Sequence, residues 1–262
     1  MRVATWNING IRSAWKKGLG DRLASIDADV VLLQEVRAMR EQAPGALLES
    51  GGYHVVWNPA DRPGYSGTAL LSRVEPRRVV YGLHDGPSEG DEEGRLLTAD
   101  LGGLVVACVY LPSGSSGEHR QAVKDQWMPR FGDWAQPLRR KRTPVLLGGD
   151  LNVAHTERDI FHWKSNQNTS GFLPHEREWM GGLLSGGWHD LIREKHGDVD
   201  GPYSWWSNRG QARALDRGWR IDYLLANAAA KKLVLDCWID RDAADGISDH
   251  APVVAQLDLP AP

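Results

Sequence analysis

The chain has 262 residues, of which 41% are hydrophobic, so it is long enough and apolar enough to bury a sizeable core. Its formal charge of -3 at pH 7 argues against a protein that holds nucleic acid through a general excess of basic residues. The segment MRVATWNING lacks the apolar stretch of a signal peptide, and no segment approaches about 18 uninterrupted apolar residues. Cys108 and Cys237 lie in apolar runs, which indicates buried thiols. We therefore expect a cytoplasmic monomer with no membrane partner.

Short β-branched and apolar runs predict strands along the whole chain, at residues 3–8, 30–35, 68–72, 96–101, 104–111, 144–153, 220–226 and 253–259. Helical spacing predicts a helix over residues 118–141, and Pro129 and Pro137 are expected to kink or break it. The Gly- and Ser-rich segments 86–94 and 111–118 are too short for interdomain linkers. These patterns predict a single domain over residues 1–262, with helices outside packed sheet.

Polar side chains collect where the predicted strands end. They are Asn7, Asn9, Glu35, Tyr110, Asp150, Asn152, Asp222, Asp249 and His250. Side chains at the ends of several strands can converge on one cleft, which is where layered α/β folds bind their ligands.

Each of these fragments also has an ordinary explanation. Asp150 follows two glycines and could belong to a simple turn, and Glu35 could end a strand in solvent. Asp222 is different because it lies between Ile221 and Tyr223, where a buried carboxylate needs a donor. His250 is the candidate donor.

The chain contains no Walker A loop, G-x-G-x-x-G or H-E-x-x-H motif. The remaining oxygen-rich set suits Mg²⁺ or Mn²⁺, and such ions serve phosphodiester hydrolysis. In this interpretation a metal on Glu35 neutralises phosphate charge, and Asp150 orients or deprotonates water. Asn152, Tyr110 and His250 donate hydrogen bonds to phosphoryl oxygens.

Seven motifs occur in an order that resembles the exonuclease III family of apurinic/apyrimidinic (AP) endonucleases, within the wider endonuclease/exonuclease/phosphatase superfamily. They are WNING, LLQE, VYLPSG, GGDLNV, HWKSNQNTSGFL, GWRIDYLLA and ISDHAPV, and they cover nearly the whole chain. The resemblance implies a four-layered α/β sandwich, with two mixed β-sheets packed face to face and helices outside. It also implies a base-excision-repair enzyme that uses Mg²⁺ to cleave double-stranded DNA on the 5′ side of abasic sites. Exonuclease activity in the 3′-to-5′ direction and cleaning of blocked 3′ ends are implied as well.

The resemblance assigns a role to each matching residue. Glu35 would be the principal metal ligand with Asn7 near it, and the full expected metal set is Asn7, Glu35, Asp150, Asn152 and Asp249. Tyr110 would contact the phosphate, Asp150 would hold the attacking water, Asn152 would stabilise the pentacovalent centre, and Asp222 would pair with His250. Asn9 stands where some relatives have Asp.

The segments YSWWSNRG and GWRID resemble the family's recognition segments. They make Trp205, Trp206 and Trp219 candidate walls of a pocket for a flipped-out abasic sugar, with Arg209 and Asn9 on the substrate side. The alternatives are core tryptophans and a solvated loop arginine. Two departures from the family pattern are Ser113, where some relatives have Asn, and residues 215–217, which place the edge of the pocket in question.

Two other functions compete with this interpretation. A superfamily phosphatase acting on an inositol or lipid head group would share Glu35, Asp150, Asn152 and His250, but the chain lacks an apolar membrane-facing loop. A catalytically silent nucleic-acid binding module would have no reason to keep a competent side chain at every catalytic position. The sequence leaves open whether Asp150 or His250 is the general base, whether one or two metal ions act, and how endonuclease and exonuclease activity are balanced.

Overall fold

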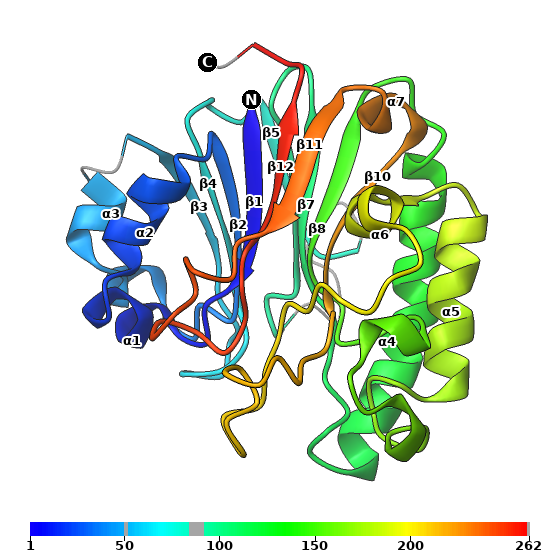
Figure 1. The fold of residues 1–262 in the computed structure, drawn as a ribbon. Helices are drawn as coiled ribbons and strands as arrows, with labels where there is room; N and C mark the ends of the chain where they lie inside the picture. The colour runs from blue at the N-terminus through cyan, green and yellow to red at the C-terminus, as the bar shows by residue number, and fades with distance from the viewer. Residues whose placement is uncertain (50–51, 84–91, 261–262) are drawn as a thin grey trace.

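A computed structural model describes residues 1–49, 52–83 and 92–260, so part of the predicted loop at 86–94 lies outside the described residues. Two mixed sheets of six strands each face one another, with the strand orders β11-β12-β1-β2-β4-β3 and β5-β6-β7-β8-β10-β9 (Figure 1). Helices α1 to α3 lie outside the first sheet, and α4 and α5 lie outside the second. The predicted four-layered α/β sandwich is confirmed.

The strands are β1 (Arg2–Asn7), β2 (Val30–Gln34), β3 (His54–Asn58), β4 (Thr68–Ser72), β5 (Arg78–Tyr81), β6 (Leu96–Asp100), β7 (Val105–Tyr110), β8 (Val145–Asp150), β9 (His189–Asp190), β10 (Asp222–Ala226), β11 (Val234–Ile239) and β12 (Val253–Leu257). The helices are α1 (Ile11–Lys16), α2 (Leu19–Ile26), α3 (Gly45–Glu49), α4 (Glu118–Leu138), α5 (Pro174–Ser185), α6 (Leu191–His196) and α7 (Ala228–Lys231).

Every predicted strand is present. Their runs of apolar residues are buried on both faces, as in β2 and β8, because each sheet is covered by helices on one side and by the other sheet on the other. The strands that the sequence did not predict are β3, β5, β9 and β11. Of these, β3, β5 and β11 carry exposed residues, which interrupt the apolar pattern, and β9 is only two residues long.

The two sheets approach closely under Gly148 of β8. A Cβ atom placed there would lie 2.6 Å from Leu32 Cδ1 of the facing sheet and 2.9 Å from Leu224 Cδ2. Glycine is therefore needed at this position for close packing, two residues before Asp150. Gly148 therefore lets the end of β8, and with it Asp150, lie close to the facing sheet.

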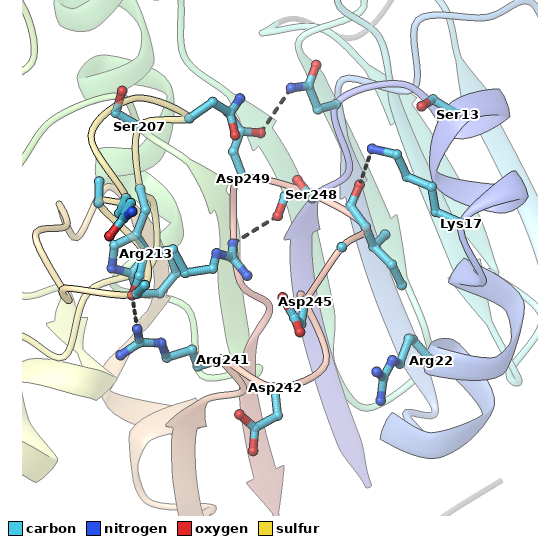
Figure 2. A pocket seen from close by; sticks show the side chains of 18 residues that line it. Ser13, Lys17, Arg22, Ser207, Arg213, Arg241, Asp242, Asp245, Ser248 and Asp249 are labelled. Carbon is cyan, nitrogen blue, oxygen red and sulfur yellow. Dashed lines mark hydrogen bonds between the residues drawn. The ribbon is translucent and has the colours of Figure 1, made fainter.

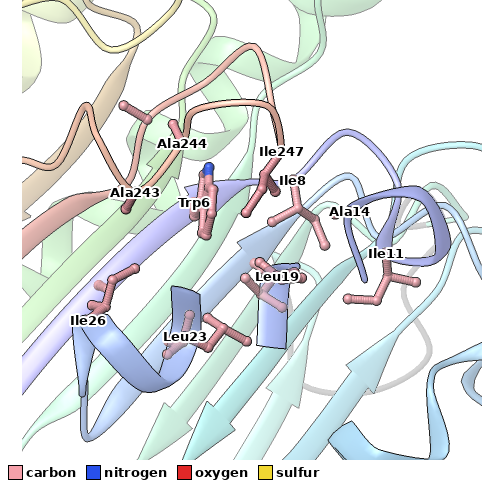
Figure 3. Packing of buried hydrophobic residues seen from close by; sticks show 14 of the residues in the cluster. Trp6, Ile8, Ile11, Ala14, Leu19, Leu23, Ile26, Ala243, Ala244 and Ile247 are labelled. Atoms are coloured by element: carbon pink, nitrogen blue, oxygen red, sulfur yellow. The ribbon is translucent and has the colours of Figure 1, made fainter. Parts of the chain in front are cut away.

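A hydrophobic core lies between the outer face of the first sheet and helices α1 and α2. Trp6 of β1 packs there with Leu19 and Leu23 of α2, and residues 243–247 cover it from above (Figure 3). The Trp6 indole N–H donates to the carbonyl of His250 at 3.0 Å. The turn ISDH is thereby fixed over the end of β1.

Pro129 and Pro137 were expected to kink or break the helix over residues 118–141, and the break is wrong, because both prolines lie inside one continuous helix. Helix α4 continues through Pro129 to Leu138. Pro129 and Asp125, whose carbonyl loses its intrahelical partner, both lie on the exposed side, where water can satisfy that carbonyl. The inner face packs Trp127 and Phe131 against the second sheet.

Cys108 and Cys237 are buried free thiols, as predicted. Within the described ranges, no helix combines the length and the apolar content needed to cross a membrane. The cytoplasmic location and the monomeric state stay predictions.

We expect Gly148→Ala to lower the free energy of unfolding by about 1–3 kcal/mol, because the added methyl group overpacks the space between the sheets. Urea denaturation measures the change. Gly103→Ala is the matched control, since a Cβ atom there meets nothing within 4 Å. Equal stability losses in the two variants would contradict the close approach of the sheets at Gly148.

Candidate active site

A cavity of about 560 Å³ opens at the end of the sandwich where β2, β7 and β8 stop. Most of the polar residues singled out from the sequence line it: Asn9, Glu35, Tyr110, Asp150, Asn152, Asp249 and His250. Asn7 and Asp222 are fully buried behind them. The strand ends therefore converge as the sequence suggested.

The side-chain amide of Asn7 joins the two sheets at the floor of the cavity. Its Nδ2 donates to Glu35 Oε1 at 2.8 Å and to Asp150 Oδ2 at 3.0 Å. Asn7 ends β1, Glu35 follows the paired strand β2, and Asp150 ends β8 of the other sheet. One NH₂ group thus holds two carboxylates facing the same space.

Asn152 makes a tight turn around Asp150. Its backbone N–H donates to Asp150 Oδ1 at 2.8 Å, and its Nδ2 donates to Leu111 O at 2.9 Å and to Asp150 Oδ2 at 3.2 Å. The turn requires a left-handed backbone at Asn152, with φ of 52°, which asparagine tolerates better than most residues. The carboxylate of Asp150 is held by several donors at once.

A buried ion pair supports this turn from below. The Lys124 ammonium of α4 donates to the carbonyl of Asn152 at 2.8 Å and to Glu176 Oε1 at 2.5 Å, and both side chains are fully buried. Glu176 Oε2 accepts the backbone N–H groups of Gly171 at 2.7 Å and Leu173 at 3.0 Å. The pair therefore ties the loop of the HWKSNQNTSGFL motif to the turn at Asn152.

His250 lies between two carboxylates. Its Nδ1 lies 2.9 Å from Asp222 Oδ2, which also accepts the Ser204 hydroxyl at 2.6 Å, and its Nε2 lies 3.9 Å from Asp150 Oδ2. Asp222 is the orienting partner that the sequence analysis expected for His250.

An apolar slot adjoins these polar groups and is walled by Trp205, Trp219 and Ile221. The two indole rings meet edge to face, with centroids 6.0 Å apart and planes at 86°. Ile221 was missed from the sequence, although it alternates with Trp219 along an extended segment and so lies on the same side. That two-residue alternation was the available signal.

The expected role of Trp206 as a wall of this slot is wrong. Its ring is 2% exposed and packs in the core with Trp6, and it does not line the catalytic cavity. The Arg213 and Arg241 guanidinium groups stack over the ring, and its indole N–H donates to Asp216 at 3.1 Å. Arg209 lies on an exposed loop and does not line the cavity either, so its expected contact with substrate stays a prediction.

The two departures from the family pattern lie in different settings. Ser113 lines the cavity and its hydroxyl lies 3.0 Å from that of Ser115. Leu215 is 48% exposed, and the Arg217 guanidinium lies 5.9 Å from the Phe161 ring centroid. Asp216 accepts the indole N–H of Trp206, and none of residues 215–217 lines the cavity.

Residues 4–250 match the Endonuclease/Exonuclease/phosphatase family. The chain belongs to this family. It is 39% identical over 254 residues to an exodeoxyribonuclease of Bacillus subtilis, covering 97% of this chain and 98% of that protein. It is 36% identical over 259 residues to the DNA repair nuclease APEX1 of Danio rerio, covering 98% of this chain and 82% of that protein.

Two solved structures superpose on nearly the whole chain. An AP endonuclease from Archaeoglobus fulgidus superposes with a TM-score of 0.89 at 30% identity, covering 99% of this chain and 100% of that one. The 3′ phosphatase NExo from Neisseria, bound to a product DNA hairpin, superposes with a TM-score of 0.89 at 28% identity and the same coverage. This family member is therefore an enzyme, a hydrolase of the exodeoxyribonuclease and AP endonuclease type, as its motifs predicted.

The cavity of this family member has the chemistry of a divalent-cation site. Glu35 Oε1 and Asp150 Oδ2 converge on one amide group, and the guanidinium of Arg37 already places a positive charge against Glu35 Oε2. Hard carboxylate oxygens that face a polar cavity fit Mg²⁺ or Mn²⁺. Glu35 and Asp150 are the residues placed to hold such an ion.

The expected ligand roles of Asn7 and Asp249 stay predictions, and the hydrogen bonds of the two side chains bear on them. Asn7 turns its NH₂ group to the acids, while its Oδ1 accepts the backbone N–H of Asn9 at 3.1 Å. Asp249 accepts Asn9 Nδ2 at 2.9 Å on Oδ1 and Trp205 Nε1 at 3.1 Å on Oδ2. Asn7 therefore acts as a donor to the acids. Asp249 has one donor on each oxygen, as Glu35 does, so its expected ligand role stays a prediction.

Burial and neighbouring charges shift the pKa values of three cavity residues, His250, Asp150 and Tyr110. Burial opposes charge on the imidazole of His250, but the charge of Asp222 and its hydrogen bond outweigh burial and raise the pKa of His250 to about 10. Burial and the nearby charge of Asp222 raise the pKa of Asp150 to about 7. Burial and the charge of Glu35 raise the pKa of Tyr110 well above its usual value. At neutral pH the ring of His250 is charged and the phenol of Tyr110 is neutral, so both can donate hydrogen bonds.

We expect Asp222→Asn to lower the pKa of His250, because the amide no longer favours the imidazolium ion while burial still opposes it. NMR titration of the His250 ring measures this pKa directly. The alkaline limb of the pH-rate profile should move to lower pH in the same variant, since the charged ring is lost earlier as pH rises. Asp242→Asn, which alters an exposed acid of the neighbouring loop, should leave the titration unchanged. An unmoved pKa in Asp222→Asn would contradict the pairing.

Proposed function

We propose that the chain is a Mg²⁺-dependent DNA-repair nuclease that cleaves the phosphodiester on the 5′ side of abasic sites in double-stranded DNA. The proposal includes 3′-to-5′ exonuclease and 3′-end-cleaning activity, carried by one domain over residues 1–262. The names of its relatives support it: an exodeoxyribonuclease, a DNA repair nuclease, an AP endonuclease and a 3′ phosphatase.

The observation that carries the proposal is the position of the apolar slot beside the acid pair. Trp205, Trp219 and Ile221 line the same cavity as Glu35 and Asp150. A deoxyribose without its base is small enough for such a slot and can place its ring carbons against the indoles, and the missing base lowers the cost of flipping it out of the helix. Such a sugar in the slot would leave its 5′ phosphate near the carboxylates.

The raised pKa values divide the chemical work. His250 is protonated at neutral pH and has no lone pair for a proton, so it donates to a phosphoryl oxygen. Asp150 orients the attacking water and accepts its proton. The neutral phenol of Tyr110 donates to the phosphate. The amide of Asn152 would exchange one of its present acceptors, Leu111 O or Asp150 Oδ2, for the developing charge.

Glu35 and Asp150 would hold the Mg²⁺ ion, which supplies neutralisation of phosphate charge and a lower pKa for bound water. The remaining contributions come from the chain itself. Asn7 holds the acid pair together, and the slot positions the sugar so that the scissile phosphate reaches His250 and Tyr110.

One assay distinguishes this function from its rivals. The protein is incubated with Mg²⁺ and four substrates: a duplex with one tetrahydrofuran abasic analogue, the intact duplex, a duplex with a 3′ phosphate, and an inositol phosphate. We expect cleavage 5′ of the analogue and release of the 3′ phosphate. Hydrolysis of the inositol phosphate alone would support a phosphatase, and binding without cleavage would support a silent module.

We expect Glu35→Ala to lower abasic-site cleavage at least roughly 100-fold at low Mg²⁺, because even indirect supports of a metal site cost 10–100-fold when removed. Raising Mg²⁺ should recover part of the rate, since the defect lies in metal affinity. Rates measured across a Mg²⁺ titration test this. Glu118→Ala, on the exposed start of α4, is the matched control. Full activity of Glu35→Ala at low Mg²⁺ would remove Glu35 from the site.

We expect Asp150→Asn to keep its affinity for abasic DNA and to lose about 10²–10⁴-fold in turnover, because the amide preserves the shape but cannot accept a proton. Fluorescence anisotropy in EDTA measures the affinity, and single-turnover cleavage measures the chemistry. A variant that cleaves saturating DNA at the wild-type rate would show that another group activates the water.

A further inference from the structure

Asp249 separates the catalytic cavity from a second groove of about 1030 Å³. Both spaces are lined by Asn9 and Asp249. The groove continues along Arg213, Arg241 and the loop of residues 242–248 (Figure 2). The carboxylate of Asp249 therefore forms part of the wall between them.

Each oxygen of this carboxylate has its own donor. Oδ1 accepts the side-chain amide of Asn9 at 2.9 Å, and Oδ2 accepts the indole N–H of Trp205 at 3.1 Å. Asn9 has a left-handed backbone, with φ of 49°, and its N–H is fixed by Asn7. Asp249 is thus held from the β1 side and in turn holds the indole.

The backbone around Trp205 is fixed independently of this bond. Trp205 and Trp219 exchange backbone hydrogen bonds at 2.9 and 2.8 Å, and the N–H of Trp206 donates to the carbonyl of Asp249 at 3.1 Å. With the main chain fixed, the remaining freedom is rotation of the Trp205 ring about its side-chain bonds. The bond to Asp249 selects the rotation that sets the ring edge-on to Trp219.

We propose that Asp249 is a positioning residue that orients the Trp205 indole and so sets the selectivity of the slot for a sugar without a base. Asn9 supports Asp249 in this role. The proposal rests on the proposed function, because it concerns the recognition of abasic DNA by the same cavity.

Asp249 also differs from Glu35 and Asp150 in its contacts. The amide of Asn7 bridges Glu35 and Asp150, whereas the Asp249 carboxylate accepts the Asn9 amide and the Trp205 indole N–H. Removing the Asp249 carboxylate should therefore alter the setting of the Trp205 ring more than the response to Mg²⁺.

Trp205→Phe and Asp249→Ala test the bond from its two ends. Trp205→Phe keeps an aromatic wall but deletes the N–H donor, and Asp249→Ala deletes the acceptor. A hydrogen bond from a neutral donor to a carboxylate corresponds to about tenfold or more in an equilibrium constant. Asp245→Ala is the matched control, because it removes an acid of the same loop that does not contact Trp205.

The first measurement uses the free protein. In ¹H–¹⁵N spectra, Asp249→Ala should move the indole N–H resonance of Trp205, and Asp245→Ala should leave it in place. The second measurement is affinity in EDTA for a duplex with a tetrahydrofuran site and for the intact duplex. The ratio of the two affinities should fall about tenfold in Trp205→Phe and in Asp249→Ala, and the double variant should be no worse than the worse single one.

Three outcomes would overturn the proposal. They are an unmoved Trp205 resonance in Asp249→Ala, additive losses in the double variant, or an unchanged affinity ratio with a raised Mg²⁺ requirement. The last result would make Asp249 a metal ligand. A wild-type protein that does not distinguish the two duplexes refutes the proposed function itself, whereas the resonance still reports on the bond. Trp205→Phe keeps the test decisive if Asp249→Ala fails to fold.

Discussion

The NH₂ group of Asn7 is the contact on which the site depends. It holds carboxylates from two different sheets close together without neutralising either of them, so they remain available to a cation. Two facing acids repel each other, and a shared donor offsets part of that repulsion. The sandwich supplies the rest, because Gly148 lets the sheets approach where the end of β8 must reach the end of β1. The distance between the two acids therefore depends on how closely the two sheets pack.

The charge state of the His250 ring depends on the two buried carboxylates beside it. A single imidazole lies near two carboxylates, 2.9 Å from Asp222 and 3.9 Å from Asp150. The closer acid, which also accepts the Ser204 hydroxyl, keeps the ring charged. The more distant acid has its proton affinity raised by burial and by its neighbour's charge. Two chemically identical carboxylates thereby take different roles because they lie at different distances from the imidazole and accept different donors.

The sequence predicted the interior strands and the polar side chains that gather at the cavity because both leave strong local signals. Strands covered on two faces are continuous apolar runs, and a polar residue at the end of such a run stands out. The half-exposed strands β3 and β11 lack that contrast. Trp206 and Ile221 were misjudged because adjacent residues point in opposite directions, and the choice between pocket and core depends on packing with Trp6, far away in sequence. Which way the amide of Asn7 turns is decided by Glu35 and Asp150, which come from two distant segments, so it cannot be read from the sequence.

The pairing of β1 with β12 has a consequence for the biosynthesis of this chain. Strand β2 pairs with one edge of β1, and β12, residues 253–257, pairs with the other edge. His250 lies three residues before β12 begins. A nascent chain that has released Asn7, Glu35 and Asp150 from the ribosome still lacks the imidazole and the strand that fixes it. Partly synthesised molecules therefore cannot complete the hydrolytic centre. A fold that pairs β1 with β12 assembles its hydrolytic centre only after residues 253–257 have been synthesised.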